Sequence, residues 1–298
     1  MAKQLRSPFR SDCLSGNVAL ITGGGSGIGY EITRQLGLHG ASVVIMGRRK
    51  NFLEGAVNSL RSDGLEAAFI QGDIPVVVSR ESAEAAVAFV TQKYGGLNIL
   101  VNGAAGNFLA NANELKLKGF KTVMEIDTVG VFNMSTAAFP SLKRSSAGVV
   151  NESVIINISM TLHYGATWYQ AHASAAKAAI DSLTRTLALE WGGHGIRVNG
   201  IAPGPIANTP GMAKLDPGIG GSAKMMIPLG RMGTTFDIAM GAVFLCSEAA
   251  AYISGSTLVV DGAEWLYKSP ALPPEAISEM SRAVEKKSRA IGAPRSNL

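Results

Sequence analysis

The alternation of short apolar runs with longer helical patterns is the feature that most constrains the fold of this chain. Seven β-branched runs predict strands, at residues 17–22, 42–47, 66–71, 98–102, 154–159, 196–202 and 257–262. Helical patterns lie between them, near residues 27–39, 50–62, 79–94, 117–142, 168–192 and 234–248. Because strand–helix–strand connections are right-handed, this order predicts an α/β protein with a doubly wound parallel sheet, the Rossmann fold.

We expect a single domain, because the alternation runs from the first strand to the last without an internal repeat. The domain is placed at residues 14–264 and is followed by a basic C-terminal tail at 265–298. Residues 1–10 and the tail together carry nine basic and three acidic residues, so the body between them is about neutral although the whole chain is +5. A protein that binds nucleic acid would carry its basic surface on the folded body. We therefore expect no nucleic-acid partner.

Several other classes of protein are also disfavoured. No apolar run approaches the ~18 residues that span a bilayer, so no membrane span is expected. The N-terminus has charges but lacks the apolar stretch of a secretory signal. Two cysteines do not make a disulfide framework, and no cluster of ligating side chains predicts a metal site.

The stretch ITGGGSGIGYEI follows the first predicted strand and opens the first predicted helix. Its glycines allow a tight turn and a close approach to a pyrophosphate, and the helix N-terminus supplies free N–H groups. A glycine-rich turn without a ligand is the alternative. We predict a dinucleotide site here, formed by Gly23, Gly25, Ser26, Gly27, Ile28 and Gly29.

The end of the second predicted strand indicates which dinucleotide is bound. An acidic residue there would bind the ribose 2′-hydroxyl of NAD, but the stretch GASVVIMGRRK contains none. Arg48 and Arg49 arrive instead, and a guanidinium at this place accommodates the 2′-phosphate of NADP. The alternative is a surface arginine pair at the start of the next helix. We predict NADP.

A long loop at residues 203–233 breaks the regular pattern. It holds seven glycines and five prolines, together with several methionines. Loops of this length in compact domains are usually functional or disordered. An adaptable cover over an apolar ligand and a surface loop without a ligand both fit the sequence.

These motifs resemble the short-chain dehydrogenase/reductase family over about residues 14–264. The loop TGGGSGIG is similar to the cofactor loop of that family, and the segments GDI, VNGAAG and RVNGIAPGPI are similar to its later cofactor segments. The resemblance implies a nicotinamide dinucleotide and adds cofactor contacts at Asp73, Ile74, Asn102, Ala104, Lys177, Pro203, Gly204 and Ile206.

Three departures from the family pattern narrow the resemblance. Ala173 stands four residues before Lys177, where the family has its catalytic tyrosine. Met160, preceded by Ser159, falls where the usual serine would be, and Asp127 stands in place of a helix asparagine. With the stretches AAGNF and HASAAK, these departures resemble the 2,4-dienoyl-CoA reductase branch of the family, in its peroxisomal form.

The resemblance to this branch implies the reduction of 2,4-dienoyl-CoA to trans-3-enoyl-CoA by NADPH, in the β-oxidation of unsaturated fatty acids. It makes Asp127 and Lys177 the catalytic residues, which position a water that protonates the α carbon of the substrate. Tyr164 is the rival proton donor. The residues expected to contact the acyl-CoA substrate are Asn107, Phe108, Ser159 and Tyr164.

Asp127 and His172 each allow two interpretations from the sequence alone. Asp127 lies in the middle of a predicted helix, so it faces either inward, with Lys177 as its partner, or outward as a surface acid. A buried carboxylate needs such a partner because its desolvation is costly. His172 is either a proton shuttle or a hydrogen-bonded structural histidine, and we take it as structural.

The chain ends in PRSNL, and Ser-x-Leu resembles the C-terminal peroxisomal address. This implies a peroxisomal location and a peroxisomal import receptor as partner. The family resemblance also implies a homodimer or homotetramer in which the helices near 117–142 and 168–192 pair. Two other functions stay open: a carbonyl/alcohol short-chain reductase with a displaced tyrosine, and a catalytically inactive NADP-binding protein.

Overall fold

A computed structural model of the chain describes residues 6–72, 79–145, 153–215 and 224–290. The predicted adenine contacts Asp73 and Ile74, and the expected peroxisomal address at 296–298, lie outside these ranges. The chain divides into two compact units, Met1–Trp265 and Leu266–Leu298, which are described separately. Among the described residues, no helix combines the length and the apolar character needed to cross a membrane.

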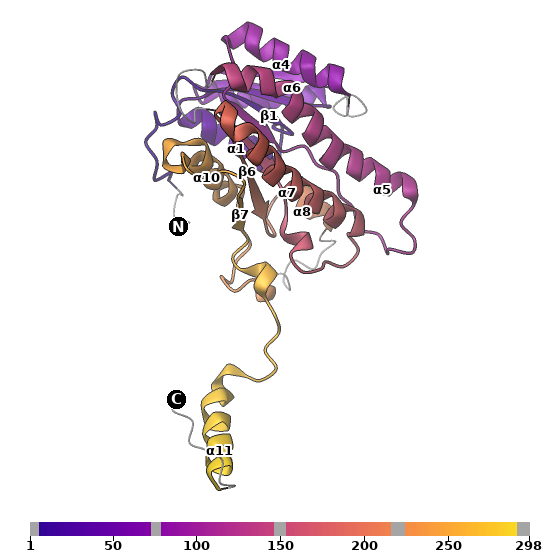
Figure 1. Ribbon diagram of the computed structural model, residues 1–298, viewed down its shortest axis with the longest axis vertical. Coiled ribbons are helices and arrows are strands. Elements are labelled where there is room, and N and C mark those ends of the chain that lie inside the picture. Colours follow the sequence, from indigo (N-terminus) through magenta and orange to yellow (C-terminus); the bar gives the residue numbers. More distant parts are fainter. Residues whose placement is uncertain (1–5, 73–78, 146–152, 216–223, 291–298) are drawn as a thin grey trace. The chain divides into compact units, whose positions relative to one another are not determined.

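The first unit is built around one sheet of seven parallel strands (Figure 1). The strands are ordered β3-β2-β1-β4-β5-β6-β7. Their bounds agree with the predicted runs to within two residues: β1 Val18–Thr22, β2 Ser42–Gly47, β3 Ala67–Gln71, β4 Ile99–Asn102, β5 Ser153–Ile158, β6 Ile196–Pro203 and β7 Thr257–Val260. The predicted Rossmann fold is confirmed. The direction of winding reverses between β1 and β4, and ligands of such sheets bind at the carboxyl ends of the strands beside that point.

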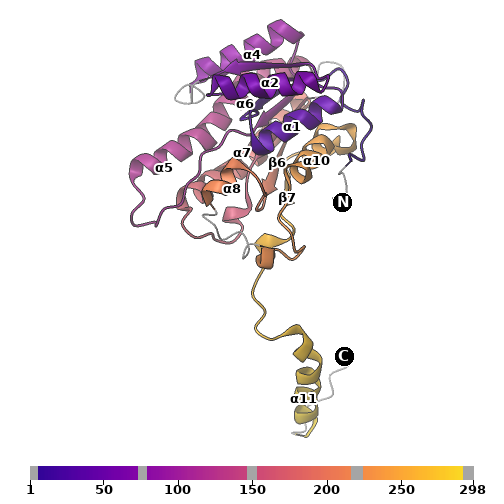
Figure 2. The same ribbon diagram turned by 180° about the vertical axis from the view of Figure 1, so that it is seen from behind.

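Helices cover both faces of the sheet. One face carries α4 (Arg80–Tyr94), α6 (Gly130–Ser145) and α7 (Ala171–Trp191), and Figure 2 shows the opposite face with α1 (Gly27–Leu38), α2 (Lys50–Ser62) and α10 (Thr235–Cys246). The remaining elements of this unit are α5 Leu117–Met124, η1 Glu125–Val129, η2 Thr161–His163, η3 Gly192–His194, α8 Pro210–Leu215, η4 Lys224–Met226 and η5 Glu248–Ala250; η6, Glu264–Leu266, crosses its end.

The core has two halves, one on each side of the sheet. Ile32 of α1 and Val243 of α10 belong to the half on one face, whereas Val87 of α4, Met134 of α6 and Leu187 of α7 belong to the other. A parallel sheet covered on both faces buries nearly every strand side chain. This explains why the strands are continuous apolar runs in the sequence.

Two helices differ from their predicted courses. The pattern at 117–142 is not one α-helix, because a π-helical turn, η1, separates α5 from α6. The helix expected from residue 168 begins at Ala171, because the backbone of Tyr169 adopts a φ of 63° that a right-handed helix excludes. Both irregularities lie beside predicted site residues.

The second unit consists of the turn η7 (Pro274–Ala276) and the helix α11 (Ile277–Ala290). None of its residues up to Ala290 is buried. Ile277, Met280 and Val284 are exposed apolar residues at helical spacing.

Candidate active site

Hydrogen bonds and close packing join the loops after β1 and β4 at the point where the winding of the sheet reverses. The hydroxyl oxygen of Thr22 accepts hydrogen bonds from the backbone N–H groups of Gly103 and Ala104, at 3.1 and 3.2 Å. A Cβ on Gly23 would lie 2.7 Å from the carbonyl oxygen of Gly103, and Gly23 has a φ of 71°. Only glycine fits such a contact and such a backbone.

The N-terminus of α1 is open at this point. Ser26 is the N-cap residue, but its side chain makes no capping hydrogen bond, and the first turn contains no acidic residue. Gly29 packs the helix tightly against the loop, because its Cβ would lie 2.4 Å from the carbonyl oxygen of Gly23. The helix therefore presents N–H groups and a positive dipole end without an internal anion, as a bound pyrophosphate requires.

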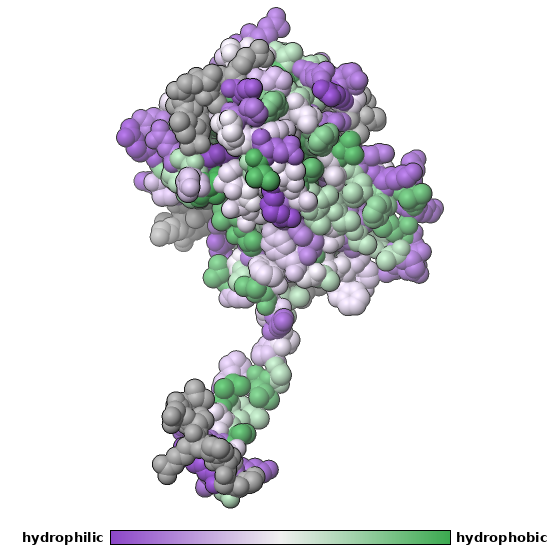
Figure 3. All heavy atoms as spheres, viewed as in Figure 1, coloured by the Kyte–Doolittle hydropathy of each residue, from purple (hydrophilic) through white to green (hydrophobic). Residues whose placement is uncertain are grey.

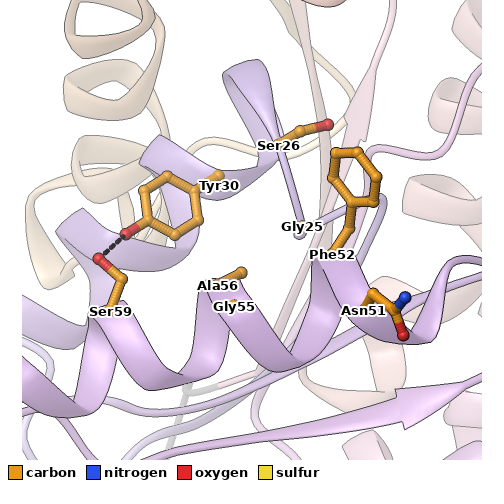
Figure 4. A pocket seen from close by; sticks show the side chains of 8 residues that line it. All are labelled: Gly25, Ser26, Tyr30, Asn51, Phe52, Gly55, Ala56 and Ser59. Atoms are coloured by element: carbon orange, nitrogen blue, oxygen red, sulfur yellow. Dashed lines mark hydrogen bonds between the residues drawn. The ribbon is translucent and has the colours of Figure 1, made fainter.

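A depression of about 510 Å³ opens beside this loop, between α1 and α2. Figure 4 shows Tyr30 and Ser59, which are hydrogen-bonded, and Ser26 nearer to Phe52. The guanidinium of Arg49 lies 3.9 Å from the centre of the Phe52 ring, and Arg48 and Arg49 are both exposed. The full lining is Gly25, Ser26, Tyr30, Asn51, Phe52, Gly55, Ala56 and Ser59.

A buried ion pair lies behind the carboxyl ends of β4 and β5. The Lys177 Nζ of α7 lies 3.0 Å from the Asp127 Oδ2 of η1, and these side chains are 3% and 1% exposed. The other carboxylate oxygen of Asp127 accepts from the backbone N–H of Gly106 at 2.7 Å. Lys177 also donates to the carbonyl oxygen of Ile158 at 3.0 Å. Asp127 therefore faces inward, with Lys177 as its partner.

The segment after β4 brings the predicted substrate residues against the start of α7. The Asn107 side-chain amide donates to Gln170 Oε1 at 2.6 Å, and its oxygen accepts from the backbone N–H of Phe108 at 2.8 Å. The Phe108 ring stacks on His172 with the ring centres 4.2 Å apart. Phe108 keeps 38% of its surface exposed, which leaves part of the ring available to a ligand.

The two other predicted substrate residues lie in different surroundings. Ser159 is buried directly after β5, and its hydroxyl makes no hydrogen bond with any described residue. Tyr164 packs edge-on against Trp265, with the ring centres 5.4 Å apart. Burial and the nearby carboxylate of Asp181 raise the pKa of Tyr164 to about 12. The structure thus associates the Tyr164 hydroxyl with Asp181, one helical turn beyond Lys177.

The remaining predicted cofactor residues line the strand ends. Asn102 is buried, and its amide donates inward to Ser135 and Asn157 at 3.1 and 2.8 Å, so its side chain ties β4 to α6 and β5. Gly204, which follows Pro203 at the end of β6, packs so closely that its Cβ would lie 2.5 Å from the Asp261 Cβ. Ile206, further along this loop, is buried.

Sequence reasoning did not identify the groups that hold these side chains in place. The backbone groups of Gly106 and Ile158 carry no signal in the sequence, because every residue has them. Gln170, which accepts a hydrogen bond from Asn107, lies two residues before the stretch HASAAK but belongs to no motif. The structural role expected for His172 stays a prediction: the ring is buried against the backbone of Phe108, but neither ring nitrogen makes a hydrogen bond of ordinary geometry with a described residue.

Comparison with known proteins agrees with this geometry. The family model described as enoyl-(acyl carrier protein) reductase matches residues 23–262. The chain belongs to the short-chain dehydrogenase/reductase family, and membership implies a nicotinamide cofactor.

Relatives within the family are more specific. The chain is 54% identical to a peroxisomal 2,4-dienoyl-CoA reductase, (3E)-enoyl-CoA-producing, of Arabidopsis thaliana, over 98% of this chain and 99% of the relative. It is 43% identical to the protein of the same name of Danio rerio, over 87% and 84%. The solved structure of a citronellol catabolism dehydrogenase of Pseudomonas aeruginosa PAO1 matches with a TM-score of 0.75 and 32% identity, covering 87% of this chain and 99% of that chain.

Proposed function

We propose that this protein is a peroxisomal oxidoreductase that reduces 2,4-dienoyl-CoA to (3E)-enoyl-CoA with NADPH, in the β-oxidation of unsaturated fatty acids. The observation that carries the proposal is the buried pair of Asp127 and Lys177 in a family whose usual tyrosine is replaced here by Ala173. The names of the full-length relatives support the same activity.

The residues around the glycine loop fit a nicotinamide dinucleotide. The open N-terminus of α1 suits the pyrophosphate, and Lys177 suits the nicotinamide ribose. Arg48 and Arg49 favour NADPH, because a guanidinium pairs with a 2′-phosphate. The Arg49 guanidinium lies over Phe52, which lines the depression beside Ser26. The reduced cofactor, when bound, supplies the hydride.

The chemistry explains why no acid is needed at position 173. Reduction of a ketone must protonate an oxygen, so an acid has to stand beside it. Reduction at the far end of a conjugated dienoyl thioester puts the new charge on the distant thioester oxygen, and the proton goes to the α carbon. Such a site needs a donor for the thioester oxygen and a separate proton source. Asn107 and Phe108 are suited to the thioester and the acyl chain.

Lys177 and Asp127 are suited to hold the water that gives this proton. An ammonium group has three N–H donors. Two of them are used by Asp127 and by the carbonyl oxygen of Ile158, which leaves one to be shared between the ribose and the water. The carboxylate fixes the direction of the ammonium group, and the ammonium polarises the water.

The protein is also expected to act as a homodimer or homotetramer. A shallow depression of about 400 Å³ between η1, α6 and α7 is lined by Thr128, Val129, Phe132, Ala179, Ser182 and Leu183. Figure 3 shows mostly apolar residues gathered over α5, α6 and α7 on this face. An exposed apolar face of this kind suits pairing with a second copy.

The location in peroxisomes rests on the relatives and on Ser296, Asn297 and Leu298, which an import receptor would read. A fluorescent reporter that carries the last ten residues of the chain should enter peroxisomes. A reporter with the last three residues removed is the control. If the intact reporter stays cytosolic, the address is not at this end of the chain.

One assay tests the proposed activity against its alternatives. The protein is incubated with NADPH and a dienoyl-CoA, with NADPH and a ketone, or with NADPH alone. We expect rapid oxidation of NADPH only with the dienoyl-CoA, and a (3E)-enoyl-CoA product by mass spectrometry and NMR. Turnover of the ketone alone would indicate a carbonyl reductase, and turnover of neither substrate would indicate a protein that only binds the cofactor.

A further inference from the structure

His172 is a buried residue of the candidate site for which the proposed reaction has so far given no role. It lies in the first turn of α7, directly before Ala173, and is 0% exposed. Neither of its ring nitrogens makes a hydrogen bond of ordinary geometry with a described residue. A buried polar atom without a partner destabilises the fold. The backbone of Phe108 lies beside one of the two nitrogens, so the other is left without a protein partner, which indicates that the imidazole binds something when the site is filled.

The ring is held rigidly in its place. One face stacks on Phe108 at an interplanar angle of 27°. Phe108 in turn packs against Gly119 of α5, where a Cβ would come within 2.9 Å of the Phe108 Cζ. An imidazole makes its hydrogen bonds in the plane of the ring, so His172 binds other polar groups through the edge that carries its nitrogens.

Burial favours the neutral form of the His172 ring. Burial lowers the pKa of His172, and the backbone of Phe108 and the charge of Asp127 act in the opposite direction but are smaller effects. The charged groups of the site on the elements packed around it are Asp127 of η1 and Lys177 of α7, which already form a pair with each other. A neutral imidazole offers one donor and one acceptor.

We propose that His172 is a positioning residue that holds the proton-giving water beside Asp127 and Lys177. One nitrogen of the neutral ring hydrogen-bonds this water and orients it toward the α carbon, while the other nitrogen faces the backbone of Phe108. His172 acts through this water and does not itself transfer the proton. The proposal rests on the proposed function, since it names a further residue of the same reaction.

Two substitutions separate the ring nitrogens of His172 from its shape. His172→Phe keeps an aromatic ring against Phe108 but removes both nitrogens. His172→Gln keeps a donor and an acceptor but removes the ring. We expect kcat with NADPH and a dienoyl-CoA to fall about tenfold in His172→Phe, which is the scale of one lost hydrogen bond, with little change in KM. His172→Gln should keep most of kcat. His194→Gln, at an exposed position of η3, is the control and should leave both constants unchanged.

The opposite pattern would overturn the inference. If His172→Phe keeps the wild-type kcat while His172→Gln raises KM, the residue serves only to pack Phe108. Thermal unfolding of each variant shows whether a loss of kcat instead reflects a loss of fold.

A measurement that needs no turnover keeps this result distinct from the proposed function. NMR of the histidine ring nitrogens should show a neutral His172 at pH 7 whose signals shift in Asp127→Asn. A charged ring, or signals that do not respond to Asp127→Asn, would reject the proposed role. If the wild-type protein reduces no dienoyl-CoA, the proposed function fails and the inference fails with it, whereas failure of the NMR result alone leaves the proposed function standing.

Discussion

Asp127 and Lys177 form an ion pair across two elements, with 3.0 Å between the Asp127 Oδ2 and the Lys177 Nζ and almost no exposed surface. Burying two charges is costly, and their attraction offsets this cost only when further hydrogen bonds satisfy both groups. The backbone N–H of Gly106 and the carbonyl oxygen of Ile158 provide these bonds. The pair is therefore held in one geometry before any ligand arrives.

Asp127→Ala should reduce turnover of the dienoyl-CoA by about 10²–10⁴, the usual range for loss of a group that supports proton transfer. The Kd for NADPH, measured by fluorescence titration, should stay nearly unchanged. The substitution also leaves the buried Lys177 without its counter-charge, so the free energy of unfolding should fall by about 3–5 kcal/mol. Asp127→Ala with near-wild-type turnover would contradict the water mechanism.

Lys177→Ala should affect both turnover and NADPH binding, because Lys177 is proposed to hold the nicotinamide ribose as well as the water. The two variants should differ in their Kd for NADPH, which only Lys177→Ala should raise. Equilibrium titration with NADPH and steady-state kinetics on the same preparations measure it. Unchanged NADPH affinity in Lys177→Ala would remove the ribose contact from the proposal.

Tyr164→Phe should keep nearly full activity. A hydroxyl whose pKa is raised to about 12 keeps its proton at neutral pH and is a poor general acid there. The ring itself packs against Trp265 and is preserved by phenylalanine. Steady-state kinetics of Tyr164→Phe beside Asp127→Ala decide between the two donors. If Tyr164→Phe is inactive and Asp127→Ala is active, a displaced tyrosine is the acid.

Replacing Arg48 and Arg49 together by glutamate should weaken NADPH far more than NADH, because the introduced carboxylates repel the 2′-phosphate. The ratio of kcat/KM for the two cofactors is the measurement. Lys93→Glu, the same reversal at an exposed position on α4, is the matched control and should leave the ratio unchanged. Equal use of NADH and NADPH by the wild-type protein would refute the predicted preference.

Phe132→Glu should disrupt the oligomer, because Phe132 is an exposed aromatic residue on the apolar face between η1, α6 and α7. Light scattering should give a dimer or tetramer for the wild-type protein and a smaller mass for the variant. Phe89→Glu, at another exposed phenylalanine on α4, should not change the mass. A monomeric wild-type protein would reject the proposed pairing.

The sequence allowed the fold to be predicted almost completely, because burial on both faces makes each strand an apolar run. Periodicity alone could not find the π turn, since a continuous helical pattern runs through residues 117–142. It also placed the start of α7 too early, because the positive φ of Tyr169 is not encoded by a glycine.

The candidate site was predictable where side chains carry the chemistry. Asp127 and Lys177 stand at family positions and are paired as expected, and the glycines mark the open helix end. Backbone partners such as Gly106 left no trace in the sequence. The surroundings of Tyr164 and His172 could not be predicted either, because they depend on which face of a turn each side chain occupies, and this is fixed only by tertiary packing.

The site depends on the number of residues in the π turn at Glu125–Val129. A π turn contains one residue more than an α turn, and each residue of an α-helix advances the direction of the side chain by about 100°. Deleting one residue of this turn would allow α5 and α6 to join as one regular helix. The side chain of Asp127 would then point in a different direction relative to the side chains of α6. The acidic group thus depends on an inserted residue as much as on its own identity, so a related chain can lose this site through a deletion while every catalytic side chain is retained.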